Sequence, residues 1–162
     1  MPEFPDSKHA LTEDCRRCPA LVESRDCISW GNGPLDASVV VVGEAPAAGD
    51  PDANLTGMAY TSRASGRKIR DLLADAGFGH EDCYFTNAVK CHPPGNRDPT
   101  SEELANCRPY LVAEVGTVAP GAVLTTGKHA TETVLALDGE SVEGFLDSVL
   151  DPRQSEALGV PV

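Results

Sequence analysis

Residues 87–100 read NAVKCHPPGNRDPT and follow directly on a short apolar run, residues 83–86. The run is typical of a β-strand, whereas the prolines and the glycine after it break regular structure. A polar amide, Asn87, and the pair Lys90-Cys91 therefore lie where a strand ends. Because open α/β sheets hold their ligands at the carboxyl ends of the strands, Asn87 and Cys91 are the first candidates for a functional site.

Strand and helix patterns alternate along the rest of the chain. Residues 38–42 read SVVVV, a β-branched run typical of a strand buried on both faces, and residues 122–126 read AVLTT. Thr100 and Glu103 have the spacing of a helix capping box. The predicted helices span residues 65–76, 101–118 and 128–137. This alternation predicts an α/β fold: a three-layer sandwich with a central, parallel, roughly four-stranded sheet and helices on both faces.

The two ends of the chain have weaker patterns. Two prolines block helix in residues 1–10, which are expected to form a flexible N-terminal tail, and residues 11–162 are expected to form a single domain. Residues 11–24 can form short helical turns interrupted at Pro19. Residues 159–162, GVPV, have the pattern of a last strand.

The chain is strongly acidic, with 25 Asp and Glu against 13 Lys and Arg and a formal charge of −12. A nucleic-acid-binding domain is usually basic, so the charge has the opposite sign to the common electrostatic signature of that class. One explanation is an acidic protein that binds no polyanion. The other is a halophilic-type acidic surface, because the Debye length falls to about 3 Å at 1 M salt and net charge then repels DNA little.

No apolar run approaches the roughly 20 residues that a membrane helix needs, and the first ten residues do not resemble a signal peptide. A soluble, cytoplasmic protein without a membrane partner is expected. In a reducing compartment, six cysteines indicate metal or thiol chemistry more than disulfides.

Four of the cysteines have a spacing that suits a metal centre. Cys15 and Cys18 form a C-x2-C pair that places two thiolates on one turn, and Cys91 and Cys107 can close the site. The spacing leaves zinc and an iron-sulfur cluster equally open. Cys83 lies inside a predicted strand and is expected to be a core thiol, since free cysteine packs as a small hydrophobe.

Taken together, these motifs resemble the iron-sulfur uracil-DNA glycosylases, families 4 and 5 of that superfamily. Gly43-Glu44-Ala45-Pro46 and the Pro-Pro-Gly-Asn-Arg-Asp loop are similar to family 4, while Ala45-Pro46-Ala47-Ala48 and Tyr60-Thr61 are more similar to family 5. The other matching segments are Cys15-x2-Cys18, Asn87 to Cys91, Pro99-Thr100 and Cys107-Arg108-Pro109-Tyr110-Leu111.

The resemblance implies a monomeric enzyme that removes uracil from single- or double-stranded DNA in base excision repair. It also implies a four-iron four-sulfur (4Fe-4S) cluster that serves structure and DNA placement. The implied ligands are Cys15, Cys18, Cys91 and Cys107. Family members continue past the point equivalent to Val162 into a His-Pro-Ser-like loop, so by this comparison the domain is truncated at its C-terminus.

The resemblance also suggests roles for the residues around the strand ends. Uracil must leave the base stack before its glycosidic bond can be cut. The amide of Asn87 can accept from uracil N3–H and donate to O4, which cytosine cannot satisfy. Tyr60 is the candidate for stacking on the flipped ring. Gly43, Glu44 and Ala45 would form a wall around the base.

A carboxylate is expected to activate the attacking water. Asp50 is the first choice, with Glu44 and Asp52 in reserve. The catalytic set is therefore Asp50, Glu44 and Asn87. His129 is expected to be an exposed helix residue rather than a catalyst.

Two other functions remain open from the sequence. One is a catalytically inactive, cluster-bearing nucleic-acid-binding protein of the same fold, since the C-terminal loop is missing. The other is a small zinc-stabilised α/β domain whose acidity reflects a protein partner.

Overall fold

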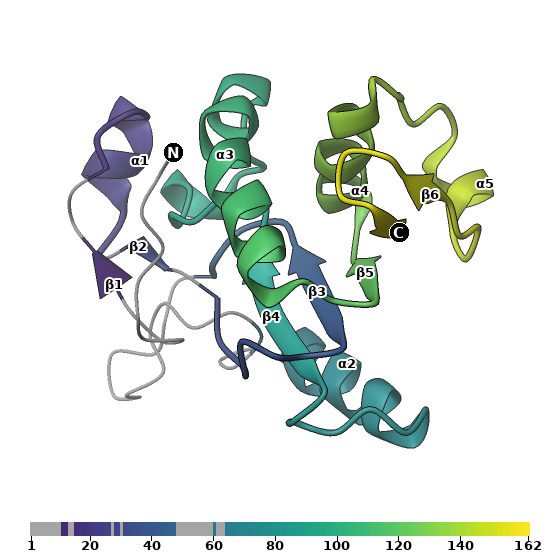
Figure 1. Cartoon of the computed structure of the whole chain (residues 1–162). Helices are drawn as coiled ribbons and strands as arrows, with labels where there is room; N and C mark the ends of the chain where they lie inside the picture. The colour runs from purple at the N-terminus through teal and green to yellow at the C-terminus, as the bar shows by residue number, and fades with distance from the viewer. Residues whose placement is uncertain (1–10, 13–14, 27, 30, 48–59, 61–63) are drawn as a thin grey trace.

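A computed structural model of the chain describes residues 11–12, 15–26, 28–29, 31–47, 60 and 64–162 (Figure 1). The predicted tail, residues 1–10, lies outside these residues. No helix in the described part is long and apolar enough to cross a membrane.

A three-stranded parallel sheet forms the centre of the described structure. Strand β3 (Val39–Gly43) lies between β4 (Cys83–Asn87) and β5 (Ala122–Thr125). Residues Val42, Thr86 and Thr125 are in register across the three strands. The next pair, Gly43 and Asn87, is therefore side by side at the carboxyl edge of the sheet.

Helices cover both faces of this sheet, which confirms the expected sandwich. Figure 1 shows α3 (Ser101–Val118) in front of the sheet and α2 (Ala64–Asp75) behind it. Val40 and Val42 pack on the side of α3 and of α4 (Lys128–Leu135), whereas Val39 and Val41 pack on the side of α2. Successive strand side chains point to opposite faces, so a strand covered on both faces requires an unbroken apolar run.

The sheet has three strands in the described residues, not the roughly four that were expected. The last segment, β7 (Val160–Pro161), pairs antiparallel with β6 (Gln154–Ser155) and does not join the parallel sheet. A proline within so short a segment removes a backbone donor, which limits the pairing that the strand can make.

The N-terminal segment differs from its prediction at one point. Pro19 does not interrupt helical turns but begins α1 (Pro19–Ser24), where the missing N–H of proline has no partner to lose. Helix α1 is flanked by an antiparallel pair, β1 (Leu11–Thr12) and β2 (Ile28–Ser29).

The remaining elements are short. The predicted helix 128–137 divides into α4 and a 3-10 turn, η2 (Ala136–Asp138). A second 3-10 turn, η1 (Pro94–Asn96), lies in the proline-rich loop after β4, and α5 (Phe145–Ser148) precedes the final hairpin.

Helix α3 begins at the predicted capping box. The Thr100 hydroxyl accepts from the Glu103 N–H at 3.2 Å, and the Glu103 carboxylate accepts from the Thr100 N–H at 2.8 Å. Arg97 donates two hydrogen bonds to the same carboxylate, at 2.9 and 2.7 Å. The cap therefore connects the start of α3 to the proline-rich loop that follows β4.

We predict that Thr100→Ala lowers the free energy of unfolding by about 1 kcal/mol, because one backbone donor at the start of α3 loses its partner. Urea denaturation of the variant measures the loss. Thr117→Ala is the control: its exposed hydroxyl donates to the Ala113 carbonyl, one turn earlier in the same helix. Equal stability of Thr100→Ala and the wild type would contradict the assigned cap.

Candidate active site

Two chain segments run together beyond the carboxyl edge of the sheet. The Ala88 N–H donates to the Gly43 carbonyl at 2.7 Å, and the Val89 N–H donates to the Glu44 carbonyl at 3.0 Å. The segment after β3 and the segment after β4 are thereby fixed against one another. The predicted base-binding residues Gly43, Glu44 and Asn87 are brought together at this edge.

Because Gly43 has no side chain, a small space lies beside its Cα atom, and two polar groups border that space. A Cβ atom added at Gly43 would lie 2.6 Å from Asn87 Oδ1 and 2.6 Å from the Tyr60 hydroxyl oxygen. Both distances are shorter than any real carbon contact, so only glycine fits without displacing its neighbours. Asn87 itself is 6% exposed. The predicted amide reader and the predicted stacking tyrosine thus converge on the same small space.

Tyr60 is held from several sides. Its hydroxyl forms a hydrogen bond with the Thr126 hydroxyl, and its ring centroid lies 5.2 Å from that of Phe85. Its carbonyl accepts from Arg70 Nε at 3.0 Å, and a Cβ at Gly66 would meet its backbone at 2.6–2.7 Å. These contacts support a left-handed backbone, φ 61°, that is uncommon for a bulky residue.

The Tyr60 hydroxyl stays protonated near neutral pH. Burial raises the pKa of Tyr60 to about 12, although its hydrogen bond with Thr126 lowers it in part. The phenol is therefore a neutral group beside Asn87, with its ring fixed in place.

Glu44 lies in a cluster of charged side chains next to this space. His129 Nε2 lies 4.0 Å from the Glu44 carboxylate and 3.4 Å from that of Asp98, and His129 Nδ1 lies 3.4 Å from Glu132. Burial raises the pKa of Glu44, nearby His129 lowers it, and Asp98 raises it. Glu44 therefore stays protonated to a higher pH than a free glutamate does.

His129 lies in a helix as expected, but the expectation that it is exposed was wrong, because its side chain is only 23% exposed and faces the site. Its place follows from topology: β5 ends at Thr125, and α4 begins at Lys128 over the same edge of the sheet that carries Asn87. A histidine in the first turn of a helix that follows a strand end could have been noticed from the sequence.

The candidate water-activating residues divide into two groups. Asp50 and Asp52 lie outside the described residues. Among the described residues, Glu44 is the predicted catalytic carboxylate and lies in the segment joined to Asn87. Ala45, predicted as part of the pocket wall, packs partly buried against the core.

The four predicted ligand cysteines gather beside this site. Cys91 and Cys107 are buried in the core cluster on the α3 face, and Cys15 and Cys18 pack against it. The pKa of Cys107 is raised to about 11, chiefly by burial and in part by nearby Cys91 and Cys18, although Lys90 lowers it. Burial also raises the pKa of Cys91, and Cys15 and Cys18 add to this shift. Cys107 is thus near Cys91 and Cys18, and Cys91 is near Cys15 and Cys18.

The sulfurs are spread more widely than a single zinc ion requires. Among the described residues, one group of three potential ligand atoms lies within 4.8 Å of one another, and it is formed by Glu44, Asp98 and His129. No three of the described cysteine sulfurs lie that close together. Four sulfurs on one zinc ion, with Zn–S of about 2.3 Å, would lie about 3.8 Å apart. A larger inorganic centre fits this arrangement better.

Hydrogen-bond donors surround the sulfurs, as expected for a thiolate-bound centre. Arg25 Nη1 donates to Cys91 and Asn106 Nδ2 donates to Cys18, each at 3.5 Å, and the nearby Lys90 backbone lowers the pKa of Cys107. Donors to sulfur stabilise the thiolate form and tune a bound cluster. Cys83, by contrast, is a buried core thiol in β4, as predicted.

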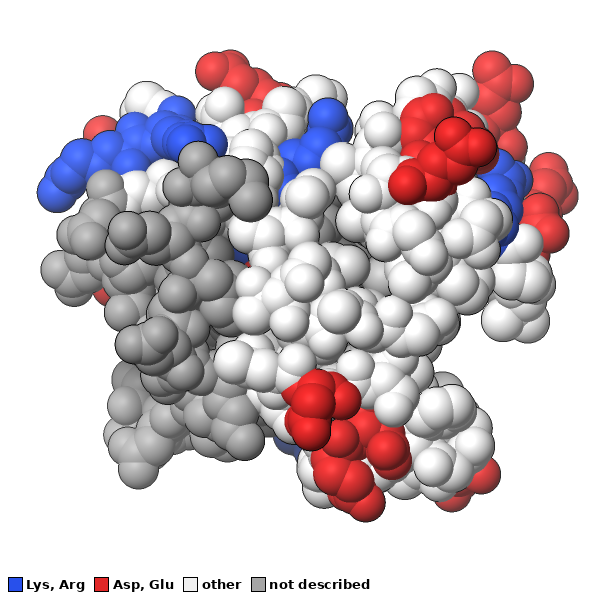
Figure 2. Space-filling view, viewed as in Figure 1, with Lys and Arg blue, Asp and Glu red and all other residues white. Residues whose placement is uncertain are grey.

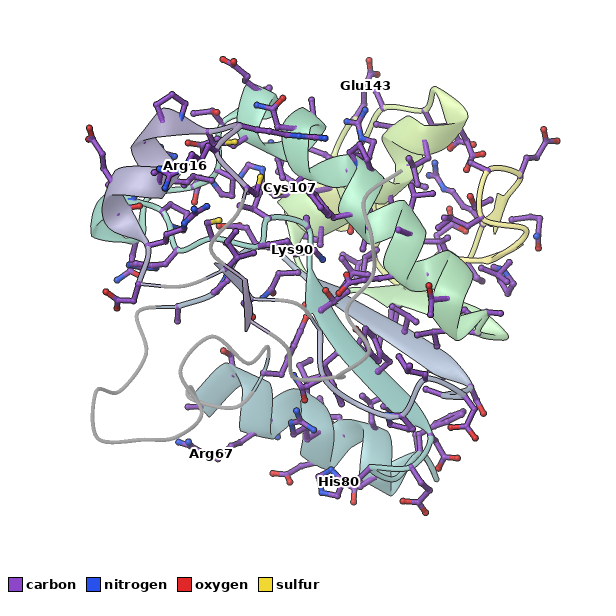
Figure 3. All side chains as sticks on the ribbon, turned by 60° about the vertical axis from the view of Figure 1, so that its left-hand side comes forward. Arg16, Arg67, His80, Lys90, Cys107 and Glu143 are labelled. Carbon is purple, nitrogen blue, oxygen red and sulfur yellow. The ribbon has the colours of Figure 1, made fainter. Side chains whose placement is uncertain are left out.

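Charge is unevenly distributed over the surface. Figure 2 shows Lys and Arg side chains gathered around α1, at the end of the molecule that carries the cysteines, and acidic side chains gathered at the opposite end and over the C-terminal segment. Arg16 lies in the C-x2-C turn and is exposed (Figure 3). A local basic surface therefore exists on a chain that is acidic as a whole.

Most of this chain is similar in sequence to proteins of a known family. Residues 30–157 match the family model of the uracil DNA glycosylase superfamily. The type-4 uracil-DNA glycosylase of Pyrobaculum aerophilum is 31% identical over 154 residues, which are 95% of this chain and 76% of the relative. That of Thermotoga maritima is 38% identical over 128 residues, 79% of this chain and 63% of the relative.

A type-5 uracil-DNA glycosylase of Pyrobaculum aerophilum is 35% identical over 160 residues, covering 82% of this chain and 70% of the relative. The chain spans about three-fifths to three-quarters of the length of these relatives. The family model matches most of the chain, and relatives of both types align with it over most of its length. The chain belongs to the uracil DNA glycosylase superfamily.

Proposed function

We propose that this chain hydrolyses the N-glycosidic bond of uracil in DNA and carries a 4Fe-4S cluster on Cys15, Cys18, Cys91 and Cys107. The observation that supports it best is the convergence of the Asn87 amide and the Tyr60 hydroxyl on the space above Gly43. The names of the relatives, type-4 and type-5 uracil-DNA glycosylase, support the same activity.

Recognition of the base falls to Asn87. A flipped uracil presents an N3–H donor and an O4 acceptor, and one side-chain amide can pair with both. Cytosine presents the reverse pattern, so two buried polar groups would lose their partners. Because Asn87 is buried and its backbone is fixed at the end of β4, little reorganisation is needed when the base enters.

Tyr60 supplies a rigid surface beside the amide. Thr126 and Phe85 fix its ring and Arg70 fixes its backbone, so it can stack on a flipped pyrimidine without losing further side-chain freedom. The Gly43 position determines how close the base can come to the backbone.

Hydrolysis also needs a carboxylate near the sugar, which becomes cationic as the bond breaks. Asp50 remains the proposed water-activating residue, and Glu44 a reserve that also contributes negative charge when ionised. The cluster supplies structural stability and DNA placement, and its ligands join the N-terminal segment to the loop after β4. The basic surface around α1 is the proposed contact for DNA phosphates, in single or double strands.

The test uses anaerobically purified protein and an end-labelled oligonucleotide with one uracil, followed by alkaline cleavage, over low to high salt. We expect cleavage at uracil and none at cytosine. A protein that loads iron and binds DNA but leaves uracil in place at every salt concentration would instead be the inactive nucleic-acid-binding protein.

Asn87→Ala is expected to lower the single-turnover rate about 100- to 1,000-fold, the usual effect of losing hydrogen bonds aimed at a reacting group. The control is Gln154→Ala, which removes an exposed amide in β6. Wild-type excision by Asn87→Ala would contradict the assigned reading of the base.

Gly43→Ala is expected to lower the excision rate at least about tenfold, because misplacing groups at the site by about 1 Å costs this much or more. Gly116→Ala is the matched control, since a Cβ there meets nothing within 4 Å and alanine favours the helix. Equal rates for the two variants would show that the space above Gly43 is not where the base binds.

Iron and sulfide analysis is expected to give about four of each per chain. Cys107→Ala should lose most of the iron, whereas Cys83→Ala should keep it, because Cys83 is buried on the other face of the sheet. Stoichiometric zinc without iron would support the zinc-stabilised domain.

A further inference from the structure

Beneath Asn87 lies a fully buried pair of opposite charges that the proposed chemistry does not use. Lys90 is 2% exposed and Glu114 is 0% exposed, and the Lys90 ammonium donates to the Glu114 carboxylate. Burying an ion pair carries a large desolvation cost that its attraction recovers only with complete hydrogen bonding. The hydrogen-bond partners of Lys90 and Glu114 therefore need an explanation.

All three protons of the Lys90 ammonium have acceptors. Besides Glu114, it donates to the Thr86 hydroxyl at 2.6 Å and to the backbone carbonyl of Asn87 at 2.6 Å. An ammonium has three donors and no acceptor, so none of its protons is left for a substrate. Lys90 cannot act as a substrate-binding or catalytic group without breaking one of these bonds.

The Glu114 carboxylate is equally saturated. It accepts from the Gly31 N–H at 2.8 Å, the Tyr84 hydroxyl at 3.3 Å and the Thr86 hydroxyl at 2.6 Å, in addition to Lys90. Burial and the neighbouring Glu114 charge raise the pKa of Tyr84, so its phenol stays protonated and donates. Four donors fill the four acceptor positions of one carboxylate.

The bond to the Asn87 carbonyl acts on the proposed base reader. The peptide group between Asn87 and Ala88 donates its N–H to the Gly43 carbonyl at 2.7 Å, and its carbonyl accepts from Lys90. Both polar atoms of that peptide are thus fixed, which sets the direction in which the Asn87 side chain leaves the backbone. No other described side chain donates to the Asn87 carbonyl among the hydrogen bonds identified.

Lys90 also contacts the proposed cluster ligands. Its backbone lies close enough to Cys107 to lower the pKa of that thiol, its carbonyl accepts from the Ser29 N–H at 2.8 Å, and Cys91 is the next residue. Figure 3 shows Lys90 and Cys107 near one another at the carboxyl end of β4. One residue therefore joins the cysteine site to the end of the strand that carries Asn87.

We propose that Lys90, held by Glu114, is a positioning residue: its ammonium fixes the Asn87–Ala88 peptide and so aims the Asn87 amide at the base. This inference rests on the proposed function of Asn87. The pair transmits the placement of the cysteine-bearing loop and of α3 to the amide, and it touches neither the base nor the reacting atoms.

The deciding variant is Lys90→Met with Glu114→Gln. Lys90→Met alone would leave a buried, unpaired carboxylate and is expected to be poorly folded. In the double variant both charges are gone. The introduced glutamine oxygen can still accept from Gly31 and Tyr84, and the introduced amide nitrogen can donate to Thr86. The Asn87 carbonyl loses its donor, so the variant separates positioning from folding.

We expect the double variant to keep the iron content, the melting temperature within a few degrees, and the affinity for DNA that contains no uracil. Its single-turnover excision rate should fall about 10- to 100-fold, because misplacing a group at the site by about 1 Å has an effect of this size. Its preference for an oligonucleotide with 2′-fluoro-2′-deoxyuridine over one with 2′-fluoro-2′-deoxycytidine should also fall, because the amide no longer faces the base correctly. A purely structural role would lower iron content and melting temperature together and leave this preference unchanged.

Arg153→Met with Glu140→Gln is the matched control, because it removes an exposed pair of the same charges, 2.9 Å apart, in the C-terminal segment. It should behave as the wild type. If the first double variant fails to fold, Thr86→Val is the deciding variant. It keeps both charges and the shape of the side chain at position 86, but it removes one hydrogen-bond partner of Lys90 and one of Glu114. A smaller fall in the same rate and preference is expected.

A folded double variant with the wild-type rate and base preference would overturn the inference while the proposed function stands. An unfolded double variant, combined with a Thr86→Val variant that has the wild-type rate and base preference, would also overturn the inference while the proposed function stands. A wild-type protein that removes no uracil would instead refute the proposed function, so the two failures are distinguishable.

Discussion

The pairing of Gly43 with Asn87 across two parallel strands is the constraint on which the site depends. Parallel register fixes these residues side by side, and the N–H groups of Ala88 and Val89 extend the pairing past the strand ends. Because Gly43 has no side chain, the amide of Asn87 and the phenol of Tyr60 can approach the same space. A shift of one residue would turn every side chain of the strand to the other face and remove the amide from this edge.

The buried polar and charged groups beneath this edge lower the stability of the fold, and the burial of apolar side chains in the core must offset that loss. Two valine-lined sheet faces, each covered by helices, provide the apolar burial. The Lys90–Glu114 pair adds little net stability by itself, since buried ion pairs often do no better than apolar replacements of the same shape. Its saturated hydrogen bonds instead define one arrangement of α3, β4 and the loop after β2, which is a gain in specificity of structure.

Elements with strong local signals could be predicted from the sequence, whereas contacts between distant segments could not. The valine run of β3 and the capping box at Thr100 depend on local pattern, and the structure has them as expected. The role of Pro19 was mispredicted, because a proline can begin a helix. The last strand lies where it was expected, but a short β-pattern does not reveal its partner, which is the antiparallel strand β6. Glu114 was visible as an acidic residue on the apolar stripe of α3, but its partners come from three other segments. His129 was missed for the same reason, since its acidic partners include residues from the segments after β3 and β4.

The placement of charge reconciles an acidic protein with the proposed DNA substrate. Carboxylates of Glu44, Asp98 and Glu132 surround one imidazole at the edge where the base would enter, so the potential there favours a cation. The sugar of a uracil nucleotide develops positive charge as its bond breaks, whereas the phosphates on either side are anionic. Different side chains meet the two demands: the basic ones gather around α1 (Figure 2), and the carboxylates lie around His129. Screening by salt weakens the long-range repulsion from the net charge more than these short-range interactions.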